Sequence, residues 1–238
     1  MIALSWSRLS TYMQCPRKFH LQFITKSFPE EEKSIHLIKG EQLHKQLEDY
    51  VIAKNGGAPM PLGFSPEVRE TLPYVDKLFT IYNQVYPEAQ VACTPEWTPT
   101  EWFDRSVGWR AIWDVIGLRP ETCFIGDYKS GRIYPLGENF GQLHLSAVIA
   151  LQRFRDTPVI TAAYIYIEHK KIVPIKVSRE PGLTNADGTK VPHLQEVQTY
   201  FEQRFEEVQQ ETAWAPTPND YCKWCPATKA MCKFSRKL

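Results

Sequence analysis

The sequence predicts a single core of the α/β or α+β class, with helices and strands in separate stretches of the chain. Helical periodicity dominates up to about residue 86, and the stretch from Ala89 to Tyr128 is instead rich in Val, Trp, Thr, Phe and Ile. A further helical segment, a hairpin pattern and a last helix follow. The 238 residues, 43% of them hydrophobic, allow one large domain with or without a small appendage.

The first third of the chain predicts four helices. They are expected from Ser5 or Ser7 to Gln14, from Pro16 onward, over residues 36–57 and over residues 66–86. Gly56 and Gly57 end the third helix, because glycine is a poor helix former. Pro73 lies inside the fourth, where it is expected to cause a kink.

The rest of the chain predicts a sheet with an embedded helix. Strands are expected around 90–97, 107–118 and 122–128, a helix over Asn139–Phe154, a hairpin over 159–177 that turns near His169 and Lys170, and a helix over 190–211. The segment APTPND then breaks the last helix before a cysteine-rich tail.

Composition argues against several classes of protein. No run of about 18 apolar residues could span a bilayer, and the N-terminal segment lacks the pattern of a secretory signal. We therefore expect a cytoplasmic protein without a membrane partner. In that compartment the six cysteines are expected to be reduced thiols or metal ligands, not disulfides.

Charge is distributed unevenly along the chain. Residues 1–28 carry four basic residues and no acid, and residues 221–238 carry five and no acid. The formal net charge is +1, so the stretch between them carries −8. Basic tails are commonly just solvated, and these two form one basic patch only if they meet in space.

The stretch FIGDYKSGR places Asp127 and Lys129 two residues apart at the end of a predicted strand. Such residues point the same way, and an isolated pair of this kind is usually a surface ion pair. Asp114 lies in the preceding predicted strand, and if the two strands are neighbours both carboxylates can face one point. Two carboxylates suit Mg²⁺ or Mn²⁺, and a lysine beside them suits metal-assisted hydrolysis of a phosphodiester. His44, on a predicted helix, is a further candidate residue for this site.

Each of these residues also has a simpler interpretation. Asp114 can be an acid in a turn at a strand end, His44 a packing or surface residue, and Lys129 a plain surface lysine.

Cysteine spacing predicts a second site. YCKWCPATKAMC contains Cys222, Cys225 and Cys232, and Cys15 is the natural fourth ligand of a metal site. Closing so long a loop costs about 5 kcal/mol, whereas a structural metal site supplies on the order of 10 to 16 kcal/mol. Such a site would bring the two basic ends together. Cys93 and Cys123 lie singly in apolar runs and are expected to be buried.

Six motifs, in order, resemble the RecB-like branch of the PD-(D/E)XK nuclease superfamily, and within it the small iron-sulfur exonucleases, such as the CRISPR-associated four-cysteine enzymes and their phage-encoded relatives. They are LSWSRLSTYMQCPRKF with Cys15, GEQLHKQLE with His44, RAIWDVIG with Asp114, IGDYKSGR with Asp127 and Lys129, GQLHLSAVIAL with Gln142, and YCKWCPATKAMC with the closing cysteines.

The resemblance implies a restriction-endonuclease-like core with a central mixed sheet flanked by helices. It implies that residues 1–28 and 212–238 form a subdomain around a [4Fe-4S] cluster, outside a core of residues 29–211. It further implies an Mg²⁺- or Mn²⁺-dependent DNA exonuclease that acts on single strands or DNA ends. The metal ligands would be His44, Asp114, Asp127 and the backbone carbonyl of Tyr128, and Lys129 and Gln142 would complete the catalytic residues.

Some features depart from the family pattern or leave alternatives open. Ser146 stands where a Tyr is common, Ala111 where a Gly is common, and no P-loop motif of a helicase is present. Zinc is the alternative occupant of the cysteine site, and a non-catalytic DNA-binding or assembly subunit is the alternative function. The partner expected besides DNA is a recombination or CRISPR adaptation protein, and phage recombination, DNA repair and CRISPR adaptation are the candidate pathways. Arg17, Arg132 and Lys223 are candidate DNA contacts.

Overall fold

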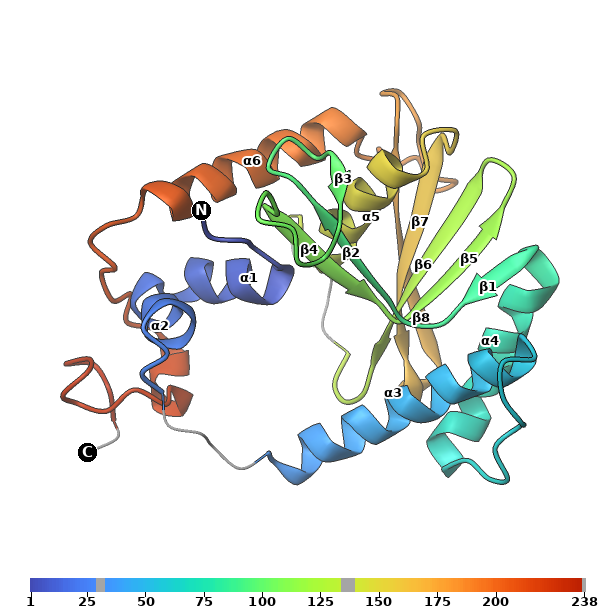
Figure 1. Cartoon of the computed structure of the whole chain (residues 1–238), viewed down its shortest axis with the longest axis horizontal. Coiled ribbons are helices and arrows are strands. Elements are labelled where there is room, and N and C mark those ends of the chain that lie inside the picture. Colours follow the sequence, from blue (N-terminus) through green and yellow to red (C-terminus); the bar gives the residue numbers. More distant parts are fainter. Residues whose placement is uncertain (29–32, 134–139, 237–238) are drawn as a thin grey trace.

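The computed structural model describes residues 1–28, 33–133 and 140–236 (Figure 1). The helices are α1 (Trp6–Gln14), α2 (Pro16–Phe19), the π-helical η1 (His20–Ile24), α3 (Ile35–Lys54), α4 (Pro66–Ile81), α5 (Gln142–Arg153), the 3₁₀ turn η2 (Ile167–His169), α6 (Leu194–Gln210) and the 3₁₀ turn η3 (Asp220–Trp224). The strands are β1 (Gln84–Tyr86), β2 (Ala89–Cys93), β3 (Pro99–Thr100), β4 (Trp109–Trp113), β5 (Val115–Arg119), β6 (Thr122–Lys129), β7 (Val159–Tyr166) and β8 (Lys171–Ser178).

The central sheet has five strands in the order β1-β5-β6-β7-β8. Only the β6–β7 pair is parallel, so the sheet is mixed. A parallel pair needs a crossover connection, and α5 supplies it between β6 and β7. A smaller sheet has the order β3-β2-β4, and its strand β4 contacts β6 and α5. A central mixed sheet with flanking helices is what the sequence predicted.

Helices cover both faces of the central sheet (Figure 1). One hydrophobic cluster joins α1, α5 and α6 to the sheet, and it contains Cys123 and Ile125 of β6. A second cluster joins α3 and α4 to the other face, and it contains Phe124 and Tyr128 of β6. Alternate residues of β6 therefore face α5 and α3, as the twofold period of a strand requires.

Several predicted boundaries were wrong. The strand expected around 90–97 ends at Cys93, and the helix expected from residue 190 begins at Leu194. The strand expected over 107–118 is two strands, β4 and β5, which belong to different sheets and are separated by Asp114. The helix expected to run to residue 86 ends at Ile81, since residues 84–86 pair with β5 instead. The helix expected from Asn139 begins at Gln142, and Asn139 itself lies outside the described residues.

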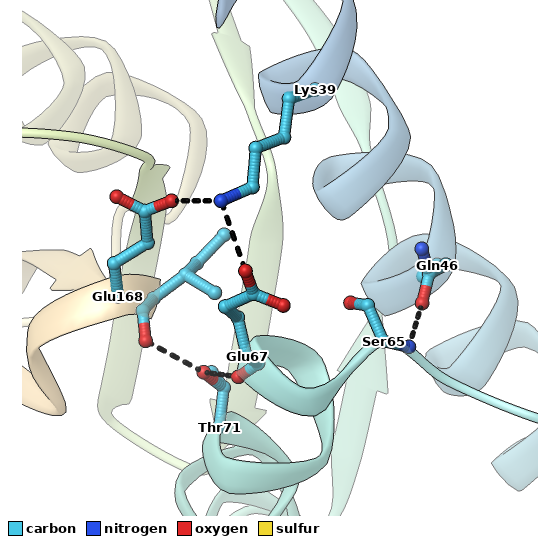
Figure 2. A network of polar contacts seen from close by, with 7 residues as sticks. Lys39, Gln46, Ser65, Glu67, Thr71 and Glu168 are labelled. Carbon is cyan, nitrogen blue, oxygen red and sulfur yellow. Dashed lines mark hydrogen bonds and ion pairs between the residues drawn. The ribbon is translucent and has the colours of Figure 1, made fainter.

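A polar network holds α3 against α4 and the β7–β8 turn (Figure 2). Lys39 Nζ lies 2.9 Å from Glu67 Oε1 and 2.6 Å from Glu168 Oε1, and the bond to Glu168, more than that to Glu67, raises the pKa of Lys39 to about 12. The Ser65 backbone N–H donates to Gln46 Oε1 at 2.7 Å, which fixes the start of α4 on α3. These contacts orient the helix that carries His44.

The two ends of the chain lie side by side. Arg17 Nε and Nη2 donate to the Met231 carbonyl at 3.2 and 3.0 Å, and Asn219 Nδ2 donates to the Gln14 carbonyl at 3.0 Å. Two segments more than 200 residues apart are thereby joined directly. No helix in the described ranges is long and apolar enough to cross a membrane.

Candidate active site

The C-terminal end of β6 brings Asp127 and Lys129 to the face of the sheet that α5 covers. Lys129 Nζ lies 2.7 Å from Asp127 Oδ2, so the expectation that the two side chains project together is confirmed. Asp127 is buried, with 8% of its surface exposed. A buried carboxylate with a lysine beside it is unlike the exposed ion pairs that contribute little to stability.

Gln142, the first residue of α5, joins this pair. Its Nε2 donates to Asp127 Oδ1 at 2.5 Å, and its Oε1 accepts from Lys129 Nζ at 3.0 Å. Asp127 Oδ2 is buried and, despite the nearby ammonium, makes no hydrogen bond of regular geometry within the described ranges. The three side chains form a closed polar ring, with one carboxylate oxygen incompletely satisfied.

Asp114 lies at the break between β4 and β5. Its backbone N–H donates to the Gly126 carbonyl at 3.2 Å, and its Oδ2 accepts the Tyr128 N–H at 2.6 Å. Asp114 Oδ1 is 3.5 Å from Nδ1 of His44 on α3, and the His44 ring meets the Tyr128 ring edge-on with centroids 5.8 Å apart. The sheet switch at Asp114 thus places both carboxylates at the same strand end.

A close approach of α3 to the end of β6 makes this arrangement possible. A Cβ at Gly40 would lie 2.7 Å from Ser130 Oγ, so a larger residue at this position would force at least the Ser130 side chain to move. His44 follows Gly40 by about one helical turn and therefore lies on the same face of α3.

Burial and neighbouring charges act in opposite directions on the pKa values of Asp127 and His44. Burial raises the pKa of the Asp127 carboxyl, Lys129 lowers it, and Asp114 adds to the rise, with a higher pKa as the result. Burial lowers the pKa of His44, but the hydrogen bond and charge of Asp114 outweigh it and raise the pKa overall. The site therefore has strong electrostatic coupling across β6.

Within residues 1–28, 33–133 and 140–236, no group of three or more His, Cys, Asp or Glu side chains is arranged to hold a metal ion. The candidate ligands are paired instead with each other and with Lys129 and Gln142. Their chemistry still fits a hard divalent cation, because two carboxylates and an imidazole meet at one strand end and Asp127 Oδ2 is incompletely bonded. A metal ion could bind here only by displacing part of this pairing.

Two cavities flank the end of β6. The cavity on the α3 side is acidic, lined by His44 and Asp114 together with Glu41, Glu48 and Glu88. The cavity on the α5 side is basic, lined by Lys129 and Gln142 together with residues of the N-terminal segment and β4. Sequence reasoning missed Glu88 and the second cavity, since no spacing pattern connects these segments.

Four of the six cysteines share a cavity between the two ends of the chain. They are Cys15, Cys222, Cys225 and Cys232. The backbone N–H groups of Thr217 and Asn219 donate to the sulfur atoms of Cys15 and Cys222 at 3.5 and 3.4 Å. Such donors are compatible with metal-bound thiolates, whose properties depend on hydrogen bonds to sulfur. The donor set fits a thiolate-bound group, although the sulfur atoms are not gathered as ligands.

The other two cysteines are buried, as the sequence predicted. Cys93 and Cys123 each have 0% of their surface exposed. Burial raises the pKa of Cys93 to about 11 and that of Cys123 to about 12, so both remain protonated thiols at neutral pH.

The candidate DNA contacts fall in three different settings. Arg17 donates to the Met231 carbonyl and lines the cysteine cavity, Arg132 is exposed just beyond β6, and Lys223 is exposed with its ammonium 5.7 Å from the Trp224 ring. Arg17 thus has a structural contact that the sequence did not reveal. Lys237, one of the basic residues of the C-terminal end, lies outside the described residues.

Comparison with known proteins gives a family match over most of the chain. The sequence model of the family described as "PD-(D/E)XK nuclease superfamily" matches residues 3–233. Eleven solved chains match in structure. One, described as a "Putative exonuclease" from Eubacterium rectale, is 15% identical, with 94% of this chain and 86% of that chain covered and a TM-score of 0.50. Another, SSO0001, is 11% identical, with coverages of 94% and 82% and a TM-score of 0.40. No curated protein matches the chain.

Proposed function

The chain belongs to the PD-(D/E)XK nuclease superfamily, and on this basis we propose that it is an Mg²⁺- or Mn²⁺-dependent DNA exonuclease that acts on single strands or DNA ends. The ring of Asp127, Lys129 and Gln142, beside the Asp114–His44 pair, carries this proposal. The family generally uses divalent metals, and its members' substrate class makes DNA the expected partner.

We assign the metal to His44, Asp114, Asp127 and the backbone carbonyl of Tyr128. When bound, the metal would polarise the scissile phosphate and lower the pKa of a water molecule. The Tyr128 N–H holds Asp114 Oδ2 at 2.6 Å, which fixes the orientation of this side chain. His44 is held against the Tyr128 ring.

Lys129 acts on the reacting groups from the α5 side, and Gln142 holds it in place. The ammonium of Lys129 can hold a water molecule or neutralise the charge that develops on the phosphate. Gln142 holds Lys129 and Asp127 in position, since its amide bonds both. Gln142 is therefore a positioning residue for the two charged groups.

The four cysteines are assigned a [4Fe-4S] cluster that joins residues 1–28 and 212–238 as a subdomain, with zinc as the less favoured occupant. Their shared cavity and the N–H donors at Cys15 and Cys222 support this assignment. The pathway stays a prediction, with recombination, repair and CRISPR adaptation as the candidates. The cytoplasmic location also stays a prediction.

The nuclease assignment is tested with end-labelled single-stranded and duplex DNA in the presence of Mg²⁺ or Mn²⁺. The parent protein should digest one or both from an end, and Lys129→Ala should lose at least 100-fold in rate, on the order of one general acid–base or electrostatic contribution. Lys176→Ala, which alters an exposed lysine of β8, should match the parent. DNA binding without digestion by the parent would favour the non-catalytic subunit instead.

The cysteine site is tested by anaerobic purification, with Cys225→Ala compared with Cys93→Ala. We expect the parent protein to be brown and to absorb near 400 nm. Cys225→Ala should lose its metal and become sensitive to protease at both chain ends, whereas Cys93→Ala should retain its metal. A colourless protein with bound zinc would replace the iron-sulfur assignment. Unchanged protease resistance of Cys225→Ala would remove the structural role.

A further inference from the structure

The basic cavity on the α5 side of β6 has a wall that the proposed catalytic residues do not explain. Lys129 and Gln142 form one part of its lining, and Arg8 of α1 and Arg110 of β4 form another. Trp102 also lines the cavity, and none of the described residues of its lining is an Asp or Glu. The cavity therefore begins at the proposed catalytic lysine and extends to two arginines.

Pairing of the N-terminal segment with β4 brings the two arginines together. The Leu4 N–H donates to the Gly108 carbonyl at 2.7 Å, and the Arg110 N–H donates to the Leu4 carbonyl at 2.8 Å. Leu4 is fully buried, so this segment is fixed in place. Helix α1 starts two residues later, which puts Arg8 in its first turn beside Arg110.

The two guanidinium groups repel one another. Burial lowers the pKa of Arg8, and the charge of Arg110 lowers it further. Neither arginine has an ion pair with a carboxylate in the described part of the chain. Such an arrangement costs free energy in the free protein and becomes favourable when an anion binds between the charges.

Both arginines keep hydrogen-bond donors for such an anion. Arg8 uses Nη1 to donate to the Ala3 carbonyl at 2.8 Å, and its guanidinium carbon is 5.2 Å from the centre of the Phe23 ring. Arg110 Nε is buried and has no hydrogen-bond partner among the described residues. The Arg110 guanidinium carbon is 5.1 Å from the centre of the Trp102 ring, so this ring orients it.

We propose that Arg8 and Arg110 together bind a phosphate of the DNA strand next to the phosphate that is cleaved, and that Trp102 supplies a surface on which the adjoining base stacks. This proposal rests on the proposed nuclease function, because only that function requires the DNA strand to run from the two arginines to Lys129. Two guanidinium groups provide several N–H donors in fixed planes, the geometry that phosphate oxygens accept best. Base stacking on tryptophan adds affinity without sequence preference.

The test measures DNA binding without catalysis. A fluorescein-labelled single-stranded oligonucleotide is titrated in EDTA at several salt concentrations with the parent, Arg8→Gln, Arg110→Gln and the double variant. Arg155→Gln is the matched control, since Arg155 is exposed and lines a separate cavity with Thr122, at the opposite end of β6. The two single variants should each weaken binding about tenfold, and the double variant should lower the salt slope by about 0.7 per lost phosphate.

Two further measurements locate the bound phosphate and control for misfolding of the variants. Arg110→Lys keeps the charge and should keep the salt slope of the parent, which a merely misfolded protein would not. Oligonucleotides with a terminal phosphate or a terminal hydroxyl show whether the bound phosphate is a terminal or an internal one. A defect seen only with the terminal phosphate assigns the site to a strand end, and an equal defect with both assigns it to an internal phosphate.

Failure of this inference differs from failure of the proposed function. If Lys129→Ala abolishes digestion but both arginine variants bind and digest like Arg155→Gln, the phosphate site is refuted and the nuclease stands. If the parent never digests DNA but the double variant loses binding and salt slope, the phosphate site stands on its own as a DNA contact.

Discussion

Acid should destabilise the protein through His144, in the first turn of α5 and two residues beyond Gln142. Its Nδ1 accepts the Gly141 backbone N–H at 3.2 Å, so this nitrogen must be unprotonated. Burial lowers the pKa of His144 to about 4. Protonation would replace an acceptor with a donor facing the N–H and place a positive charge at the N-terminus of a helix, where the dipole opposes it.

The magnitude follows from the difference between the folded and unfolded pKa. The folded pKa of about 4 lies roughly 2.5 units below the unfolded value of 6.5, and each unit corresponds to 1.36 kcal/mol. The unfolded state binds the proton first, so the free energy of unfolding is unaffected above pH 6.5 and falls between pH 6.5 and 4. The full loss attributable to His144 is at most about 3 kcal/mol.

The assay is urea unfolding of the parent and of His144→Gln between pH 7.5 and 4.5, followed by circular dichroism. Glutamine at the third helical position can still bond the N–H that precedes the helix but carries no titratable group. Below pH 6 the parent should lose about 1.4 kcal/mol more per pH unit than the variant. Equal pH dependence in the two proteins would refute the assigned role of His144.

Two further changes test how the site is supported. Gly126→Ala should cost about 1 to 3 kcal/mol in urea unfolding, because its Cβ would lie 2.5 Å from Val115 Cγ1 at the pairing of β5 with β6; stability equal to the parent would contradict the close packing. Arg179→Met should cost about 1.5 to 3 kcal/mol, since Nη2 donates to the Leu151 and Phe154 carbonyls at the end of α5 at 2.7 and 3.2 Å; an unchanged urea midpoint would show that these bonds contribute nothing.

Local patterns predicted much of the core and of the site. The twofold period of a strand was enough to place Asp127 and Lys129 on one face, because that relation depends only on neighbouring residues. The hairpin of β7 and β8 was predicted for the same reason, and its turn at Lys170 has a positive φ of 52°. Long helical periods likewise predicted α3 and α5 to within a few residues.

Long-range pairings could not be predicted in the same way. The sheet switch at Asp114 depends on β4 pairing with β2 and on β5 pairing with β6, and the local sequence of residues 107–118 contains no signal of either pairing. The juxtaposition of Arg8 and Arg110 depends on the Leu4 bridge to β4. The role of Gln142 came from resemblance alone, whereas its bonds to Asp127 and Lys129 now give a physical reason for it.

The two histidines near the site should make acid act in two separable steps. Burial lowers the pKa of His144, whereas Asp114 outweighs burial at His44 and raises the pKa there. His44 must be unprotonated to bind a metal, so acid weakens metal binding first, beginning above pH 6.5. The stability change at His144 develops only below pH 6.5. Metal-dependent activity should therefore fall at a higher pH than stability, and His144→Gln should move only the second transition.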